Sequence, residues 1–572
     1  MPWGSEQSFF RRIFLKMLFM LTNSIALFIQ IGDTVFFPFV YKRSTGDIFK
    51  FLALGGGDDT TTLIPTVIRD YWYMIVLWLL MVLLVYILYT ILGRESIQNS
   101  KVEQKHPITS FTVASYVVFM GLIIMGCRGG WQLHSIDTVD AGDVAPPHDI
   151  PLVMNSPFSI LVTYYRPVLD DKKLTHDSDV KREYTPVHTP ARANFRRLNV
   201  VTIIMESMSK EYIGALNNLH KTHTPFLDSL ITQSLVFDNA FSDGKKSIEG
   251  IPAVVASLPS WMNTAFITSP YTDDQYSCMA EILDKEGYNT SFFHGGHNGT
   301  MGFEEFCKKG GFKYYYGMKQ YDNNKRDYDG NWGIWDEIYF QYFARTLDTM
   351  HQPFYSAIFS ISSHHPFAIP EKYKNRFVQK PGEIPIEKCI EYSDLSLKEF
   401  FATASKMPWY DSTIFIITAD HTGPSKDPYY SNRLGMYEIP LIFYMPHSNL
   451  KGRSHLTAEH IDIMPSILDY LHYPKNYYSF GKSLFDSNAN SHYAINYLND
   501  VYQIEKNPWC LQMVGNRIAG FYNYQKDSML KDNLMDKPIK AKDTLAGILR
   551  KVLETYNRAV VHNDLKLKKG GI

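Results

Sequence analysis

A polar stretch in the middle of the chain places a hydroxyl beside two cations. Residues 243–250 read DGKKSIEG and lie between a strand-like run, residues 234–238, and an apolar run with helical character, residues 251–258. Ser247 is therefore expected at the entry to a helix, where free N–H groups and a partial positive charge favour phosphate or sulfate. Serine is also a favoured helix N-cap, so a purely structural role explains this stretch alone equally well.

Further acids and histidines stand where an apolar strand gives way to a polar turn: Glu206, His294, His364, Asp420 and His421. In open α/β sheets, ligands collect outside the carboxyl ends of the strands. A single strand-end acid is often a helix cap and a single histidine is more often structural, but their joint placement at one sheet edge favours a site. Two carboxylates and one imidazole suit a divalent cation such as Mn²⁺ or Zn²⁺. A hydroxyl bound to such an ion becomes a nucleophile, which gives Ser247 a use.

The elements that must position these residues alternate between strand and helix from residue 198 onward. Strands are expected at residues 198–205, 289–293, 354–360, 413–418 and 439–444. Helices are expected at residues 224–232, 277–285, 333–350, 387–405 and 461–471. This alternation predicts a parallel α/β sheet flanked by helices. A strand at residues 518–524 and a helix at residues 541–558 are expected to complete the same domain.

The first 130 residues are apolar enough to enter a membrane. Residues 71–93 contain no charge and are long enough to span a bilayer. Together with two further apolar runs they predict three membrane helices, at 13–32, 71–93 and 109–127. A cleaved signal peptide is the alternative for the first run. The predicted organisation is a transmembrane domain (1–130), a linker with a possible membrane-surface helix (131–197) and an outer catalytic domain (198–572).

The distribution of basic residues indicates how the chain is oriented in a membrane, and the net charge limits the classes of partner. Basic residues within 11–16 and 94–105 would lie on one side, which the positive-inside rule makes cytoplasmic, although the expected loop 33–70 is also partly basic. Everything after residue 130 would then lie outside the cytoplasm. A net charge of −1 gives no general attraction to nucleic acid, so no such partner is expected. The five cysteines form no CxxC pair, so no zinc knuckle or redox pair is indicated.

Five motifs occur in a recognisable order. They are NVVTIIMES (199–207), GKKSIEG (244–250), SSHHPF (362–367), ADH (419–421) and IDIMPSIL (461–468). Together with the membrane segment, they resemble the lipoteichoic acid synthases. These belong with the osmoregulated-glucan phosphoglycerol transferases in the sulfatase-like part of the alkaline phosphatase superfamily. The resemblance implies an α-helical membrane anchor joined to a sulfatase-like α/β domain, whose mixed sheet is flanked by helices.

The resemblance also implies a role for individual residues. The metal ligands would be Glu206, Ser247, Asp420 and His421, with Mn²⁺ the common ion and Mg²⁺ or Zn²⁺ as substitutes. Ser247 would be the nucleophile in a position where the family most often has threonine. His364 would contact the phosphate group and assist proton transfer. The substrate would also be contacted by His294, Trp332 and Lys246.

The activity implied by the resemblance is transfer of phosphoglycerol from phosphatidylglycerol to a glycan or polymer acceptor, through a covalent Ser247 intermediate. It would take place at the outer face of a bacterial cytoplasmic membrane. Residues 295–306 contain no arginine, unlike the family segment that touches glycerol phosphate, so transfer of phosphoethanolamine from phosphatidylethanolamine is an alternative. The sequence also leaves open a phosphodiesterase or sulfatase-type hydrolase and an inactive binding module. A formylglycine sulfatase is disfavoured, because no proline stands two residues after Ser247.

Overall fold

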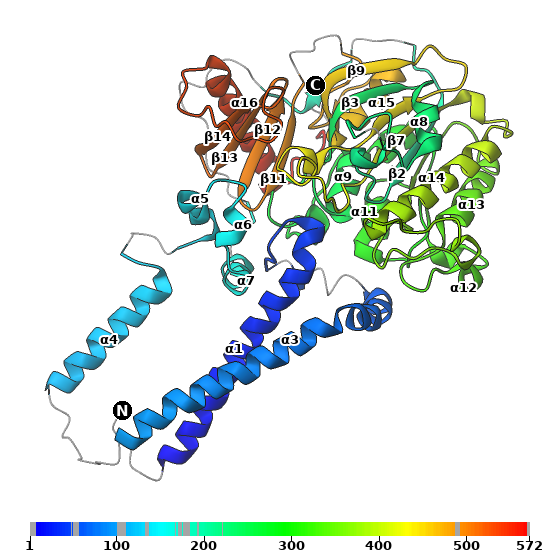
Figure 1. Ribbon diagram of the computed structural model, residues 1–572. Coiled ribbons are helices and arrows are strands. Elements are labelled where there is room, and N and C mark those ends of the chain that lie inside the picture. Colours follow the sequence, from blue (N-terminus) through cyan, green and yellow to red (C-terminus); the bar gives the residue numbers. More distant parts are fainter. Residues whose placement is uncertain are drawn as a thin grey trace.

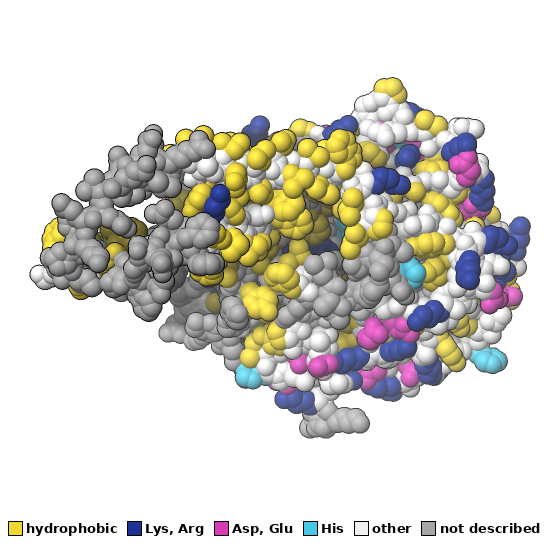
Figure 2. All heavy atoms as spheres, turned by 90° about the horizontal axis from the view of Figure 1, so that it is seen from below, with side chains coloured by type: hydrophobic (Ala, Val, Ile, Leu, Met, Phe, Trp, Pro, Cys, Tyr) yellow, Lys and Arg dark blue, Asp and Glu magenta, His cyan; other side chains and the backbone are white. Residues whose placement is uncertain are grey.

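Two long apolar helices cross each other beneath a larger α/β body (Figure 1). The computed structural model describes residues 7–46, 48–49, 56–99, 110–131, 136–165, 168–169, 174, 184–190, 194–219, 221–486 and 492–568. The crossing helices are α1 (Gln7–Val40) and α3 (Gly56–Asn99), and Trp78 Nε1 donates to the carbonyl of Ser24 across them at 3.0 Å. Their segments Ile13–Val40 and Ile64–Leu92 are long and apolar enough to cross a membrane. In Figure 2 hydrophobic side chains gather over the helical end of the molecule.

The two helices are longer than the sequence indicated. The expected loop at residues 33–70 is wrong, because α1 continues to Val40 and α3 already begins at Gly56. The charge of Asp33 does not end α1, because the carboxylate is paired. It accepts hydrogen bonds from Arg43 and from the backbone N–H of Ser44, each at 2.7 Å. The third predicted span corresponds to α4 (Ser110–Arg128), and residue 109 lies outside the described residues. Its apolar part is shorter than the other two, so this span stays a prediction.

The body is built on one eight-stranded sheet with the order β5-β4-β6-β2-β7-β8-β3-β9. Strand β8 runs antiparallel to both of its neighbours, and the other pairs are parallel. The parallel sheet expected from the alternation of elements is therefore wrong, whereas the mixed sheet implied by the family resemblance is confirmed. The strands are β2 (Asn199–Met205), β3 (Leu235–Phe241), β4 (Asn289–His294), β5 (Tyr314–Tyr316), β6 (Phe354–Phe359), β7 (Thr413–Ala419), β8 (Leu441–Tyr444) and β9 (Gly452–Glu459).

Helices cover both faces of this sheet because its central strands are apolar on both sides. Along β2, Val201 and Ile203 face one hydrophobic cluster, and Val200 and Ile204 face the other. The first cluster is closed by α8 (Pro225–Ile231), α13 (Asp336–Asp348) and α14 (Pro385–Ala404). The second is closed by α9 (Ser247–Ala256), α10 (Met279–Asp284), α11 (Phe303–Lys309) and α15 (Ile463–Tyr470). A single turn of helix, α12 (Asn324–Asp327), lies before α13.

A second, smaller sheet follows in the C-terminal part of the chain. It is an antiparallel meander of β11 (Ala494–Leu498), β12 (Val501–Lys506), β13 (Trp509–Val514) and β14 (Arg517–Asn523), packed against α16 (Lys540–Val561). The sequence indicated only its last strand and its helix. Trp261 Nε1 donates to the carbonyl of Ile495 at 2.8 Å and so ties this sheet to the main body. A short pair, β1 (Val187–His188) with β10 (Tyr477–Tyr478), lies elsewhere on the body.

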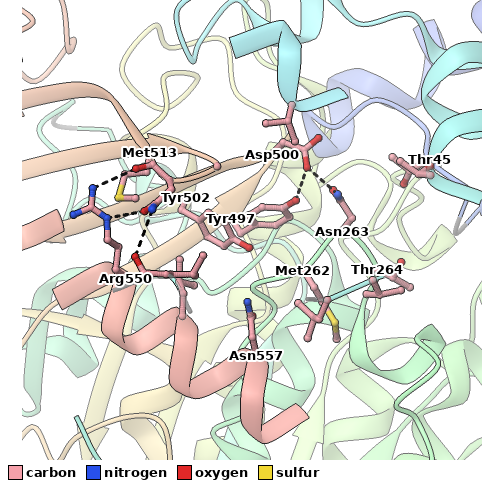
Figure 3. Close-up of a pocket in the computed structure, with 18 residues that line it drawn as sticks. Thr45, Met262, Asn263, Thr264, Tyr497, Asp500, Tyr502, Met513, Arg550 and Asn557 are labelled. Carbon is pink, nitrogen blue, oxygen red and sulfur yellow. Dashed lines mark hydrogen bonds between the residues drawn. The ribbon is translucent and has the colours of Figure 1, made fainter. Parts of the chain in front are cut away.

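The connection between the apolar N-terminal helices and the body is folded where it is described. It contains α5 (Ala141–Val144), α6 (Ile150–Val153) and α7 (Ser156–Tyr165). Ser156 N–H donates to Gln30 of α1 at 3.3 Å. Part of the expected linker at 131–197 falls outside the described residues. The connection, the main body, the second sheet and α16 line a partly open pocket of about 380 Å³, where Asp500 accepts hydrogen bonds from Asn263 and Tyr497 (Figure 3).

Candidate active site

Four side chains meet where β2, β7 and α9 end or begin. Ser247 is the first residue of α9, and its Oγ donates to Glu206 Oε2 at 3.3 Å. The same Oγ lies 3.5 Å from His421 Nε2. Glu206 directly follows β2 and Asp420 directly follows β7, and these strands are neighbours in the sheet. The structure thus brings together Glu206, Ser247, Asp420 and His421, at the sheet edge where the sequence placed them.

The approach of α9 to the end of β7 depends on a glycine. A Cβ on Gly250 would lie 2.1 Å from the carbonyl oxygen of Asp420. Only glycine allows the helix backbone to come this close. Gly250, at the end of the DGKKSIEG stretch, therefore allows α9 to hold Ser247 close to Asp420.

We expect Gly250→Ala to lower the free energy of unfolding by about 1–3 kcal/mol, as overpacking of a buried contact does. It should also weaken divalent metal binding, because α9 must move away from Asp420. Both are measured by denaturant titration in detergent with and without Mn²⁺. Gly32→Ala is the matched control, since no atom lies within 4 Å of its added Cβ. Equal metal affinity in Gly250→Ala and wild type would contradict this account.

The donor set fits a divalent cation. Asp420 Oδ1 accepts hydrogen bonds from the N–H groups of Ser207 (2.9 Å) and His421 (2.8 Å), whereas Oδ2 is buried and has no hydrogen-bond partner among the described residues. His421 Nδ1 must donate to the carbonyl of Thr422 at 2.9 Å, so the Nε2 lone pair is free to face an ion. Nε2 lies 3.3 Å from Asp420 Oδ2 and 3.7 Å from Glu206 Oε1.

Electrostatics also favour a cation here. Burial, together with the neighbouring carboxylate of Asp420, raises the pKa of Glu206 well above its usual value. A raised carboxyl pKa means that the folded protein resists placing two negative charges at this point. The facing ligand atoms of Glu206, Asp420 and His421 all lie within 4.8 Å of one another. A bound cation would remove the repulsion and give the unpartnered oxygen a ligand bond.

His364 and Trp332 form an adjacent wall. Their ring centroids are 3.9 Å apart, and His364 Nδ1 is buried without a hydrogen-bond partner among the described residues. Asp336 holds the turn that carries His364, because its carboxylate accepts from the N–H groups of Ile361 (2.8 Å) and Ser362 (3.1 Å). Burial and the nearby imidazoles lower the pKa of His364 to about 3, so this ring is neutral near pH 7.

The other two predicted substrate residues differ in exposure. His294 ends β4, is buried, and donates from Nδ1 to the carbonyl of Phe359 at 3.4 Å. Burial lowers its pKa to about 4. Lys246 is half-buried and can face a ligand, whereas its neighbour Lys245 is buried and donates to the carbonyl of Met436 at 3.0 Å. Substrate contact by His294 and Lys246 stays a prediction.

Sequence reasoning missed three residues that hold the site. Ser207 Oγ donates to Glu206 Oε1 at 2.5 Å, and Ser363 Oγ donates to the Glu206 carbonyl at 2.6 Å. His460 Nε2 donates to the Ala419 carbonyl at 2.8 Å, which fixes the end of β7. The position of Ser207 next to Glu206 was a usable signal. His460 had none, because only the pairing of β9 with β3 brings it here.

The fold and the site define a class, the sulfatase-like proteins of the alkaline phosphatase superfamily, and comparisons agree. The family model described as Sulfatase matches residues 198–473. A protein in the alkaline phosphatase superfamily from Vibrio parahaemolyticus superposes with a TM-score of 0.58 and 22% identity, covering 69% of this chain and 96% of that one. The lipoteichoic acid synthase LtaP from Listeria monocytogenes superposes with a TM-score of 0.55 and 19% identity, covering 65% and 96%.

The curated relatives that the chain resembles are lipoteichoic acid synthases. Lipoteichoic acid synthase 1 of Bacillus subtilis (strain 168) is 26% identical over 313 residues, covering 50% of this chain and 48% of the relative. Lipoteichoic acid synthase of Staphylococcus aureus (strain USA300) is 27% identical over 324 residues, covering 52% and 48%. The match thus spans about half the length of these relatives. Residues 198–473 thus form a sulfatase-like domain, and about half of the chain is similar to lipoteichoic acid synthases.

Proposed function

We propose that the chain is a membrane-anchored, metal-dependent transferase that moves phosphoglycerol from phosphatidylglycerol to a glycan or polymer acceptor outside the cytoplasm. The observation that carries this proposal is the position of Ser247. Its hydroxyl stands at a helix start, 3.3 Å from Glu206 Oε2 and 3.5 Å from His421 Nε2. The same Nε2 lies 3.3 Å from Asp420 Oδ2, which lacks a hydrogen-bond partner among the described residues. Relatives named lipoteichoic acid synthase support the choice of substrate class.

The reaction has two displacements at phosphorus. Ser247 Oγ attacks the lipid phosphodiester, the bond to the diacylglycerol oxygen breaks, and diacylglycerol leaves with a proton. A phosphoglycerol ester of Ser247 remains. An acceptor hydroxyl then attacks the same phosphorus and loses its proton, while Ser247 Oγ leaves and is protonated again. This double displacement predicts ping-pong kinetics.

The site residues divide this work. A divalent ion, Mn²⁺ in first place with Mg²⁺ or Zn²⁺ as substitutes, would be held by Glu206, Ser247, Asp420 and His421, and would lower the pKa of the hydroxyl and polarise a phosphoryl oxygen. Glu206 Oε2 already accepts the Ser247 hydrogen bond and so lies within reach of its proton. Neutral His364 can donate one hydrogen bond to a phosphoryl oxygen. Lys246 would add a positive charge, which favours phosphoryl transfer electrostatically.

Two competing functions differ from the proposed one in the group that is transferred or in the acceptor. A phosphoethanolamine transferase would use the same core and differ only where the head group is held, with phosphatidylethanolamine as donor. A phosphodiesterase or sulfatase-type hydrolase would use water in the second displacement. In each case α1 and α3 would anchor the chain in a bacterial cytoplasmic membrane, with the body outside.

The proposal predicts a covalent adduct. The protein is mixed with phosphatidylglycerol, phosphatidylethanolamine and Mn²⁺ without acceptor and analysed by intact-mass and peptide mass spectrometry. We expect a metal-dependent phosphoglycerol mass on the peptide that contains Ser247, because no acceptor is present to remove it. A phosphoethanolamine mass would support the second donor. Release of diacylglycerol without an adduct would favour a hydrolase, and release of nothing would count against both lipids.

A further inference from the structure

The outer end of α1 together with the three residues that follow it, residues 33–43 (the α1 end), lies against Lys246 and Lys245 at the start of α9. The ring centre of Phe36 is 5.5 Å from Lys246 Nζ, and the ring centre of Tyr41 is 5.4 Å from Lys245 Nζ. Asn499 Nδ2 donates to the Tyr41 carbonyl at 2.8 Å, and Lys42 Nζ donates to the backbone of the catalytic body. The α1 end is therefore docked on the body at the entrance to α9.

Residues 66–71 of α3 (the α3 end), up to the kink at Tyr71, contact the other side of the site. Thr66 Oγ1 donates to Asn331 Oδ1 at 3.2 Å. The Tyr71 ring stacks on His365 with centroids 5.7 Å apart. The His365 carbonyl in turn accepts from Trp332 Nε1 at 2.5 Å, and Trp332 lies on His364. A continuous series of contacts therefore connects α3 to the wall of the site.

The height of these contacts relative to a membrane follows from the sequence of α1. Taking Asp33, the first charged residue after Lys16 along this helix, as the outer limit of the hydrocarbon layer places the head-group layer at the outer part of the apolar segment Ile13–Val40. Phe36 comes three residues later, about 4.5 Å further along the helix axis. The head-group layer is about 5–7 Å thick on each side of the hydrocarbon core. Lys246 beside Phe36 therefore lies at the level of lipid phosphates.

We infer that the α1 and α3 ends form the membrane-side wall of the catalytic site, and that Phe36 is a positioning residue that holds the Lys246 ammonium against the phosphodiester of a lipid still in the bilayer. The inference rests on the proposed function. Cation–π contact restricts a flexible lysine while leaving its N–H groups free to donate. Lys246 is half-buried and directly precedes Ser247, so an ammonium held there meets the phosphate that Ser247 attacks.

The first test compares Phe36→Ala with wild type in the full chain. We expect kcat/KM to fall about 3- to 10-fold, the value of one cation–π contact, both for phosphatidylglycerol in vesicles and for soluble bis(p-nitrophenyl) phosphate. Lys246→Gln should lower both rates, and adding Phe36→Ala to it should change little more. Phe14→Ala is the matched control, because Phe14 is a largely exposed aromatic residue near the other end of α1. A fall with the vesicle substrate alone would reduce Phe36 to an anchoring role and overturn its positioning role.

Two further readouts do not depend on turnover. Thr66→Cys combined with Asn331→Cys should form a disulfide on mild oxidation, and neither single variant should. Inorganic phosphate should bind Mn²⁺-loaded Phe36→Ala about 3- to 10-fold more weakly than wild type, by calorimetric titration. No crosslink, or unchanged phosphate affinity, overturns the inference. A wild-type protein that binds phosphate, and whose double-cysteine variant crosslinks, but that never becomes modified at Ser247 contradicts the proposed function instead.

Discussion

Replacing Ser247 with alanine is expected to lower lipid turnover by at least about 10³-fold and to remove the covalent adduct, because the attacking oxygen is lost. The fold should be unaffected, since the Ser247 hydroxyl contacts the side chains of Glu206 and His421, and the N-cap position of α9 is Lys246. Metal binding should weaken but persist, because Glu206, Asp420 and His421 remain. Adduct mass, diacylglycerol release and Mn²⁺ content measure the three effects. Ser247→Thr should retain turnover, since it keeps the hydroxyl.

Ser207→Ala is the matched control for that variant. Both hydroxyls donate to the same carboxylate, Ser247 to Oε2 and Ser207 to Oε1 of Glu206. In the proposed mechanism Ser207 orients the Glu206 carboxylate and does not attack phosphorus, so we expect a loss of turnover of roughly 10-fold and an intact adduct. If Ser207→Ala abolished the adduct and Ser247→Ala kept it, the roles of the two serines would be reversed.

The sequence predicted the inner part of this site well, for a physical reason. Glu206 and Asp420 each follow an apolar strand directly, His294 ends one, and strands of a parallel pair end at the same edge. Ser247 was predicted at a helix entry from its own neighbours, and the structure begins α9 at that residue. Local patterns suffice here, because each residue lies at a strand end or a helix start, and pairing of the strands brings these ends together.

What the sequence could not supply depends on pairings between distant segments. Strand β8 reverses the direction of the sheet, but a buried antiparallel strand has the same apolar run as a parallel one. His460 reaches β7 only because β9 pairs with β3. Phe36 fell in the predicted loop 33–70, whereas it belongs to α1. Its place beside Lys246 follows from the docking of α1 on the body, which no local pattern records.

Asp420→Asn is expected to remove most of the metal-induced stabilisation while making the metal-free protein more stable. The asparagine Oδ1 can keep the hydrogen bonds from Ser207 and His421. Its Nδ2 replaces the buried Oδ2, which lacks a partner among the described residues, and so removes one of the two negative charges that repel each other at Glu206. An amide nitrogen is not a ligand for Mn²⁺, so affinity should fall at least about 100-fold.

The melting temperature in detergent separates these two effects. At a Mn²⁺ concentration of about 100 times the wild-type Kd, binding stabilises the wild type by about 2.7 kcal/mol, whereas a variant that binds about 100-fold more weakly gains only about 0.4 kcal/mol. Asp336→Asn is the control, because it should change the stability of the metal-free protein in the opposite direction. Both of its carboxylate oxygens accept hydrogen bonds, so it should melt earlier yet keep the full Mn²⁺ shift. If Mn²⁺ raised the melting temperature of Asp420→Asn as much as that of the wild type, the cation would bind elsewhere. The proposal that a metal activates Ser247 would then be contradicted.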